Sequence, residues 1–212
     1  MDNKQKSFSI EGLNNNVTQF SSGAVRDIQE NKGRMDLLPL SVVGDLVSIY
    51  RETFLTISHK KEQELSEEIF KNINSYIYEG DTNKLLNSLC NFIFMSLEWC
   101  DYVASERIYY ALLDVSMHYK KGLEKYGERN WEKGIPLHSY IDSGVRHYIK
   151  WCAHFTDERH DLAFIWNLLC CCHTHQFIRN DSLQDLPFCK IEKDSSKVTN
   201  NKLGWNLTEE NK

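Results

Sequence analysis

Residues 118–167, HYKKGLEKYGERNWEKGIPLHSYIDSGVRHYIKWCAHFTDERHDLAFIWN, decide the fold of this chain. Apolar residues recur at helical spacing in two parts of the stretch, which predicts helices at about 139–154 and 158–177. Only a short polar loop separates them, so the two helices should run antiparallel. A further helix at about 103–126 precedes them and should end at Gly127, because glycine readily adopts the left-handed conformation that closes a helix.

Three more helices are predicted upstream of this stretch. One begins near Pro39, since proline suits the first turn of a helix. The others span about 61–79, where apolar residues share one face and Gly80 ends the helix, and about 82–100. No run alternates apolar and polar residues over more than a few positions, so little or no sheet is expected. The chain is therefore predicted to be all-α, a bundle of about five to six helices.

The organisation of the chain is predicted to be simple. A length of 212 residues suits a single domain, which we assign to residues 21–178. Residues 21–40 should form a loop that docks on the helical body. Residues 1–20 are polar and Asn-rich and are predicted to be a flexible N-terminus, and residues 179–212 are predicted to be a polar C-terminal tail.

Composition narrows the class of protein. The formal net charge is −5 and no run of Lys or Arg dominates, so duplex nucleic acid is not an expected partner. The chain has no apolar stretch of about 18 residues and no signal-like N-terminus, so no membrane association is expected. The seven cysteines are odd in number and three are adjacent, which indicates a reducing, cytoplasmic location. Cys170, Cys171 and Cys172 should serve as small core residues, because no second cluster completes a zinc site.

An acidic pair near the start of the last helix can hold a metal ion. Glu158 and Asp161 are three residues apart, so they share one face of a helix. Carboxylates so placed can bind a divalent cation that bridges phosphate oxygens. The same pair can instead simply favour the helix dipole, since acidic residues stabilise a first turn.

The preceding helix carries further polar candidates. Asp142 and Arg146 are four apart and can pair with each other, and Ser139 with Asp142 resembles a capping box. His147 lies about 140° around the helix from Asp142, so the two cannot face one site equally well. His147 shares its face with Trp151, which is also compatible with a packed core histidine.

The connection before that helix is basic, aromatic and amide-bearing. Its aromatic rings can stack on a base and its cations can meet phosphates, although Trp131 can equally anchor the loop on the core. The residues concerned are Lys125, Tyr126, Arg129, Asn130 and Trp131.

Two blocks of the sequence resemble the dATP/dGTP diphosphohydrolase family found mainly in phages, an outlying branch of the all-α MazG-like nucleotide pyrophosphohydrolases. The first block is SGAVRD at 22–27 with KGRMDLLP at 32–39. The second is KYGERNWEKG at 125–134, followed by Tyr140, Asp142, Arg146, His147, Trp166 and Asn167. Because the blocks lie far apart here, the helices at about 61–100 are interpreted as an insertion relative to the family.

This resemblance implies a function and a cofactor. It implies an all-α, usually homo-oligomeric protein, a dimer or higher, that uses Mg²⁺ or Mn²⁺. Its substrate would be a purine (deoxy)nucleoside triphosphate resembling dGTP or dATP, cleaved to monophosphate and pyrophosphate. If the protein is phage-encoded, it would act in the cytoplasm of a bacterial host.

The resemblance also implies roles for individual residues. Asp142, Glu158 and Asp161 become candidate metal ligands, and His147 a catalytic or orienting group. The remaining candidates contact the nucleotide. Those for its phosphates are Arg26, Lys32, Arg34, Lys125, Arg129 and Arg146, and those for its base or ribose are Tyr126, Asn130 and Trp131.

Three other readings stay open. A non-catalytic nucleotide-binding protein, such as a sponge for a signalling nucleotide in phage–host conflict, fits because the acidic motif of MazG-like enzymes is incomplete beside an intact basic and aromatic set. An HD-type phosphohydrolase would use His118, His160 and Asp161 as ligands with a later Asp181 or Asp185. A purely structural protein would bind no nucleotide.

Overall fold

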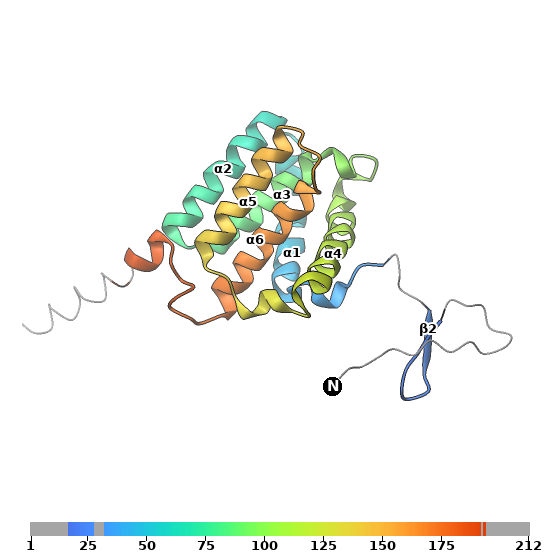
Figure 1. Ribbon diagram of the computed structural model, residues 1–212. Helices are drawn as coiled ribbons and strands as arrows, with labels where there is room; N and C mark the ends of the chain where they lie inside the picture. The colour runs from blue at the N-terminus through green and yellow to red at the C-terminus, as the bar shows by residue number, and fades with distance from the viewer. Residues whose placement is uncertain (1–16, 28–31, 192, 194–212) are drawn as a thin grey trace, which may run out of the picture.

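The computed structural model describes residues 17–27, 32–191 and 193. Its long elements are all helices, so the predicted all-α fold is confirmed (Figure 1). They are α1 (Leu40–Ile57), α2 (Glu62–Glu79), α3 (Thr82–Met95), α4 (Arg107–Tyr126), α5 (Leu137–Cys152) and α6 (His160–Phe177). The intervening short 3₁₀ turns are η1 (Met35–Leu37), η2 (Leu97–Trp99), η3 (Ala104–Glu106) and η4 (Asn130–Lys133).

Helix α6 forms the centre of the bundle. It packs along α5 and also contacts α1, α3 and α4, while α2 packs along α3. Its side chains are buried on nearly every face, including Cys170, Cys171 and Cys172, as expected for an apolar helix surrounded by others. These cysteines are free thiols, so the prediction that they serve as core residues is confirmed. Gly144 permits the close approach of α5, because a Cβ there would lie 2.8 Å from Leu168 Cδ1.

Local sequence signals set several helix ends. Gly80 closes α2 with a φ of 73°, and Asp81 then caps α3 by accepting a hydrogen bond from the backbone N–H of Asn83 at 3.0 Å. Gly127 closes α4 with a φ of 91°. Each of these backbone angles favours glycine, because a Cβ is crowded in that region. Helix α3 ends at Met95, earlier than predicted, because Ser96 is extended and starts η2.

Two features differ from the sequence expectation. Val17–Gln19 (β1) and Val25–Asp27 (β2) form a short antiparallel ladder, where the sequence predicted a flexible N-terminus followed by a loop. Residues 183–189, assigned to the polar tail, instead bury Leu183, Leu186 and Phe188 against the bundle. The alternating apolar residues of this segment are too few to give a periodic signal. Residues 1–16 of the predicted flexible N-terminus (1–20) and residues 194–212 of the predicted polar tail (179–212) lie outside the described residues.

The C-terminal segment also caps α5. The backbone carbonyl of Leu183 accepts a hydrogen bond from the N–H of Leu137 at 3.0 Å, and Asp185 Oδ1 accepts one from the N–H of His138 at 3.1 Å. These acceptors satisfy donors that a helix N-terminus leaves unpaired. Residues 183–189 therefore belong to the folded body.

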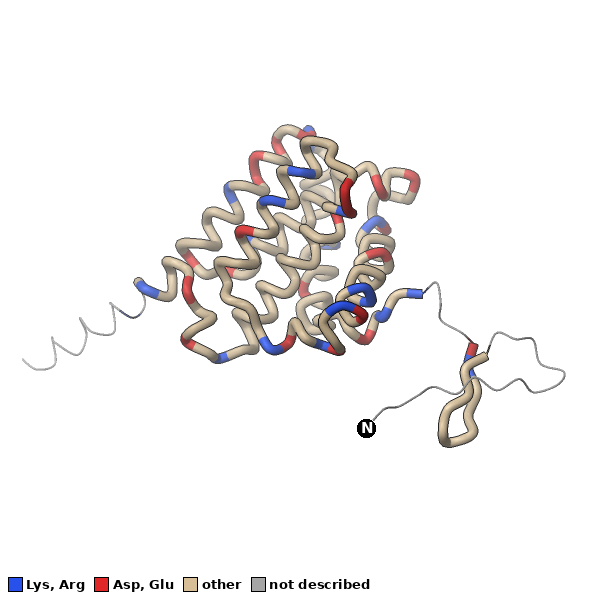
Figure 2. Tube along the Cα trace, viewed as in Figure 1, with Lys and Arg blue, Asp and Glu red and all other residues tan. Residues whose placement is uncertain are grey.

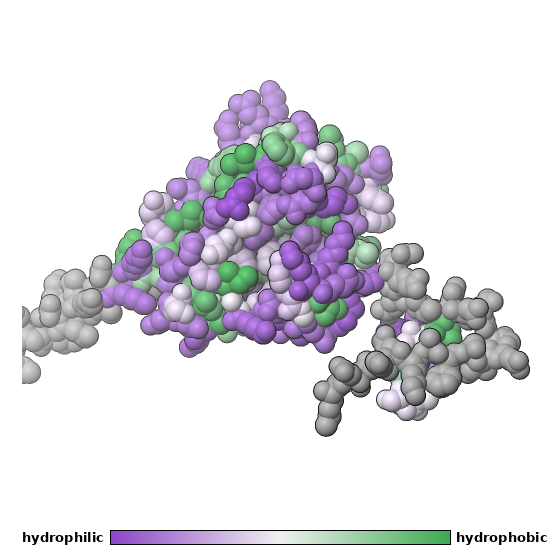
Figure 3. Space-filling view, viewed as in Figure 1, coloured by the Kyte–Doolittle hydropathy of each residue, from purple (hydrophilic) through white to green (hydrophobic). Residues whose placement is uncertain are grey.

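The surface carries both signs of charge. Figure 2 shows Lys and Arg positions interspersed with Asp and Glu positions along the helices. The face seen in Figure 3 is mainly hydrophilic, broken by apolar patches. Within the described residues, no helix is both long and apolar enough to cross a membrane.

Candidate functional site

A cavity of about 420 Å³ lies between α4, α5, α6 and the connection that follows α4. Its size falls in the range of small-molecule sites. Aromatic side chains form much of its wall, and polar groups converge on it from all three helices. Those used below are His118 and Tyr126 from α4, Arg129, Asn130 and Trp131 from the connection, His147 from α5, Glu158 from the loop before α6, and Asn167 from α6.

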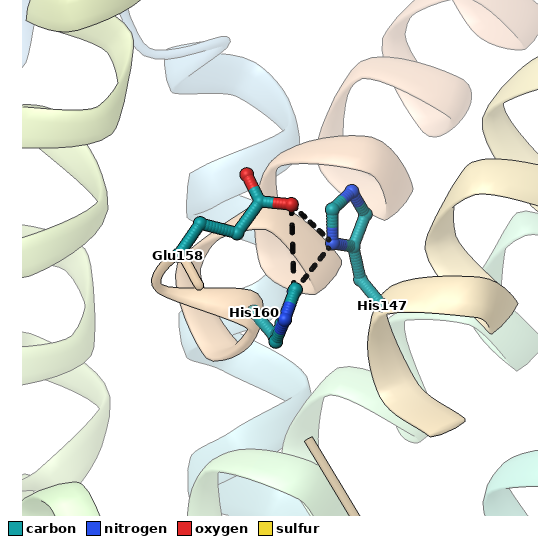
Figure 4. A group of neighbouring side chains, drawn as sticks. All are labelled: His147, Glu158 and His160. Atoms are coloured by element: carbon teal, nitrogen blue, oxygen red, sulfur yellow. Dashed lines mark hydrogen bonds and ion pairs between the residues drawn. The ribbon is translucent and has the colours of Figure 1, made fainter. Parts of the chain in front are cut away.

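Two histidines and a glutamate meet where α5 ends and α6 begins (Figure 4). His147 Nδ1 lies 3.0 Å from His160 Nδ1, and Glu158 Oε1 lies 3.5 Å from each of these nitrogens. His160 is buried, His147 half-buried and Glu158 exposed. We call His147, Glu158 and His160 the His–Glu cluster.

The spacing within the His–Glu cluster suits one metal ion. Imidazole and carboxylate ligands lie about 2.0–2.2 Å from a bound divalent ion. Two such atoms subtending 90° to 110° at the ion are about 2.8 to 3.6 Å apart, from the same bond lengths. The three observed separations, 3.0, 3.5 and 3.5 Å, fall within that range. The donor set and its geometry therefore fit a divalent cation.

Asp157 fixes the orientation of His160. Its Oδ1 lies 2.8 Å from His160 Nε2, and its Oδ2 accepts from Lys150 Nζ at 3.1 Å. These two hydrogen bonds lower the pKa of Asp157 to about 2. Because the carboxylate accepts the proton of Nε2, a neutral His160 presents the lone pair of Nδ1 to the cluster. A carboxylate behind a histidine ligand in this way orients the ring and raises its basicity.

Burial keeps His147 neutral. Desolvation lowers the pKa of His147, and the negative charge of Glu158 opposes this without reversing it. His160 and Lys150 act in the same direction as burial. A neutral imidazole is the form that binds metal, so the environment of His147 favours that role.

The structure does not bring Asp142 and Asp161 into the cluster. Asp142 is exposed on α5 and pairs with Arg146, as the i,i+4 spacing predicted. Asp161 is buried, and both its oxygens accept hydrogen bonds from Arg159, at 2.9 Å to Oδ1 and 2.5 Å to Oδ2. Of the three predicted metal ligands, only Glu158 therefore lies in the His–Glu cluster, which is the one such group among the described residues.

The connection after α4 supplies one end of the cavity. Tyr126 is exposed, whereas Trp131 is buried and packs edge-on against Tyr119. Arg129 has a φ of 51°, which is unusual for a residue other than glycine. Its guanidinium donates to Glu132 Oε1 at 2.7 Å and so is held in place.

Two other residues that were predicted to contact phosphate do not line the cavity. Lys125 lies over the ring of Tyr126, with its Nζ 4.9 Å from the ring centroid, and is not part of the cavity lining. Arg146, paired with Asp142 on the outer face of α5, does not line it either.

Three predicted phosphate contacts line a different cavity. Arg26, Lys32 and Arg34 face a space of about 790 Å³ beside the middle of α4. Arg34 is bound to Asp36 and to Glu128, at 2.6 and 3.1 Å. The sequence analysis placed the early basic residues and the metal ligands at one site. In the structure, Arg26, Lys32 and Arg34 line a different cavity from His147 and Glu158.

The resemblance gave no role to several residues that lie in the cavity wall or in contact with the His–Glu cluster. His118 and His160 were candidates only in the HD-type alternative, Asn167 was named only as part of the resemblance, and Asp157 was not among the candidates. The sequence signal for His160 is its position: His147 and His160 lie on either side of the short connection between two antiparallel helices, so their side chains can meet. Local spacing alone does not reveal such a contact between helices.

Comparison with known proteins finds one family model that matches part of the chain. Residues 103–185 match the family model described as dATP/dGTP diphosphohydrolase, N-terminal. No match was found among curated proteins or among solved structures. The matched range contains α4, α5 and α6, and with them the His–Glu cluster and the cavity wall apart from Leu37. Residues 103–185 are therefore similar to the dATP/dGTP diphosphohydrolase N-terminal domain, the family that the second block of the sequence resembles.

Proposed function

We propose that this protein hydrolyses a purine (deoxy)nucleoside triphosphate to a monophosphate and pyrophosphate, using a divalent metal ion held by the His–Glu cluster. One observation carries the proposal. The same cavity wall contains His147 and Glu158 together with the aromatic, amide and basic residues Tyr126, Asn130 and Arg129. A nucleotide needs this combination, because its base is flat and apolar while its phosphates are charged.

The wall suggests how the nucleotide would lie. Tyr126 is exposed and can stack on a base, a contact that every nucleobase permits. The Nε1–H of Trp131 is buried and lacks a hydrogen-bond partner within the described residues, so an acceptor on a ligand would satisfy it. Asn130 adds both a donor and an acceptor. The triphosphate would then extend toward the His–Glu cluster.

The donor set indicates which metal ion to expect. A bound divalent ion would offset the negative charge of the phosphates during displacement at phosphorus. Imidazole is a better ligand for Mn²⁺ and later transition metals than for Mg²⁺, which prefers oxygen. Two of the three donors here are imidazole nitrogens. We therefore expect Mn²⁺ to support activity better than Mg²⁺.

A second function is supported by a separate observation. Asp161 is engaged by Arg159 and Asp142 by Arg146, so the cluster contains one carboxylate where the resemblance implied three. A protein whose metal cluster has one carboxylate, but whose cavity keeps its aromatic, amide and basic residues, can bind a nucleotide without hydrolysing it. The two functions differ in turnover and not in binding.

Product analysis distinguishes the two functions. The full chain is incubated with each purine and pyrimidine triphosphate, with Mn²⁺ or Mg²⁺, and the products are separated by anion exchange. Monophosphate and pyrophosphate from a purine triphosphate, lost in His147→Ala and Glu158→Gln but kept in Glu67→Gln, support hydrolysis. Glu67 is an exposed residue of α2 and serves as the matched control. Nucleotides that raise the melting temperature without yielding product support the binder instead.

The remaining features of the resemblance are also proposals. A homo-oligomer, a MazG-like relationship, a phage source and a cytoplasmic location are all compatible with a hydrolase of free nucleotides. Light scattering on the purified chain measures the first of them directly.

A further inference from the structure

His118 is a third histidine in the wall of the cavity. It lies on α4, whereas the His–Glu cluster comes from α5, α6 and the loop between them. Its ring packs near Trp166, with 6.3 Å between ring centroids. Glu158 and His147 are close enough for their charges to act on it. His118 therefore lies near the cluster on a separate element.

The position of His118 separates it from the ligands. The described histidines, cysteines and acids that gather within reach of a single ion are His147, Glu158 and His160, and His118 is not among them. Nor does any ion pair between described residues involve His118. A half-buried imidazole that lines a cavity and pairs with no carboxylate is available to whatever occupies that cavity.

We propose that His118 is a catalytic residue that accepts the proton of the attacking water; this rests on the hydrolysis proposed above. The oxygen of water forms a bond to the α- or β-phosphorus, and the bond from that phosphorus to the bridging oxygen breaks. The electron pair of the broken bond leaves on the bridging oxygen of the departing group. The proton released from water passes to the unprotonated ring nitrogen of His118, which later returns it to solvent.

The surroundings of His118 favour its neutral form. Burial is the main cause that lowers the pKa of His118, and Lys121 and His147 act in the same direction. Glu158 and Asp161 raise it in part. A neutral imidazole has one free lone pair, which is what a proton acceptor requires.

The test compares His118→Gln and His118→Ala with the wild-type chain. His59→Gln is the control, because His59 is exposed in the turn between α1 and α2. Three quantities are measured: kcat and KM for the best purine triphosphate, Mn²⁺ affinity by calorimetry without nucleotide, and recovery of kcat when free imidazole is added. Thermal unfolding by circular dichroism confirms that each variant is folded.

The proposal expects kcat to fall by about 10²- to 10⁴-fold in both variants, the usual effect of losing an acid–base group. Mn²⁺ affinity and KM should stay at the wild-type values, and imidazole should restore part of the rate to His118→Ala. A His118→Gln variant with near wild-type kcat overturns the proposal. So does a parallel loss of Mn²⁺ affinity, which would make His118 a ligand. If the wild-type chain releases no pyrophosphate, the proposed hydrolysis itself fails. If the wild type and His118→Gln both hydrolyse the nucleotide at similar rates, only the role of His118 fails.

Discussion

Asp157, which contacts His160, is predicted to strengthen metal binding at the proposed His–Glu site. In the wild-type chain, Asp157 Oδ1 lies 2.8 Å from His160 Nε2. Asp157→Asn keeps an oxygen that can accept this hydrogen bond but removes the negative charge. It also removes the ion pair with Lys150. Loss of such a supporting contact costs about 10- to 100-fold in metal affinity. We expect about tenfold weaker Mn²⁺ binding for Asp157→Asn, and a loss nearer 100-fold for Asp157→Ala, which removes the acceptor as well.

Calorimetric titration of the nucleotide-free chain with Mn²⁺ measures this effect. Asp181→Asn is the control, since the Asp181 side chain is 93% exposed and far along the chain from the His–Glu cluster. Equal Mn²⁺ affinity in the wild type and both Asp157 variants would refute the reasoning that Asp157 orients His160. Equal weakening in Asp181→Asn would show that the change reflects net charge alone.

The same carboxylate predicts a dependence of stability on pH. Its pKa is depressed from the usual 3.8 to about 2 in the folded chain. A depressed folded-state pKa contributes stability above the unfolded value that is lost as pH falls through the folded value. The difference in unfolding free energy between the wild type and Asp157→Asn should therefore shrink as pH falls from 3.8 toward 2. A difference that stays constant over this window in urea titrations would contradict the assignment.

Three further predictions address the surrounding structure. Asp161→Asn should lower the free energy of unfolding by about 1.5–3 kcal/mol, because it weakens charged hydrogen bonds from Arg159. Mn²⁺ affinity measured by calorimetry should stay unchanged, and a loss of Mn²⁺ binding would show that Asp161 is a ligand. Tyr126→Ala should weaken nucleotide binding by about 1–3 kcal/mol through lost stacking, and an unchanged Kd for the best nucleotide would exclude Tyr126 as the base contact. Gly144→Val should destabilise the fold by about 1–3 kcal/mol in urea titrations, since its side chain would overlap Leu168; a neutral result would mean that α5 and α6 tolerate a wider spacing.

Much of the fold could be predicted because its signals are local. Gly80 and Gly127 end helices at the predicted positions, because each adopts a positive φ that glycine tolerates better than other residues. The burial of Leu183 and Phe188 could not be predicted, because it depends on the surfaces that α5 and Gly80 present to a short irregular segment.

The candidate site could be predicted only in part, for a similar reason. The motif residues near Trp131 and His147 do line one cavity. The role of Asp161 could not be predicted from spacing, because Arg159, two residues earlier, binds its carboxylate. His160 becomes a candidate ligand only when α5 and α6 bring it to His147, a contact between two helices. Arg34 is drawn to Asp36 and Glu128, and so faces another cavity.

We propose that the His–Glu cluster holds a metal ion beside a bound nucleotide. Crystals of the full chain grown with Mn²⁺ and a non-hydrolysable purine triphosphate analogue, measured for anomalous scattering, test it most directly. We expect an anomalous peak about 2.0–2.3 Å from His147 Nδ1, Glu158 Oε1 and His160 Nδ1, with the base of the analogue against Tyr126. A peak at Asp142 or Asp161, with the three cluster atoms bound to nothing, would contradict it.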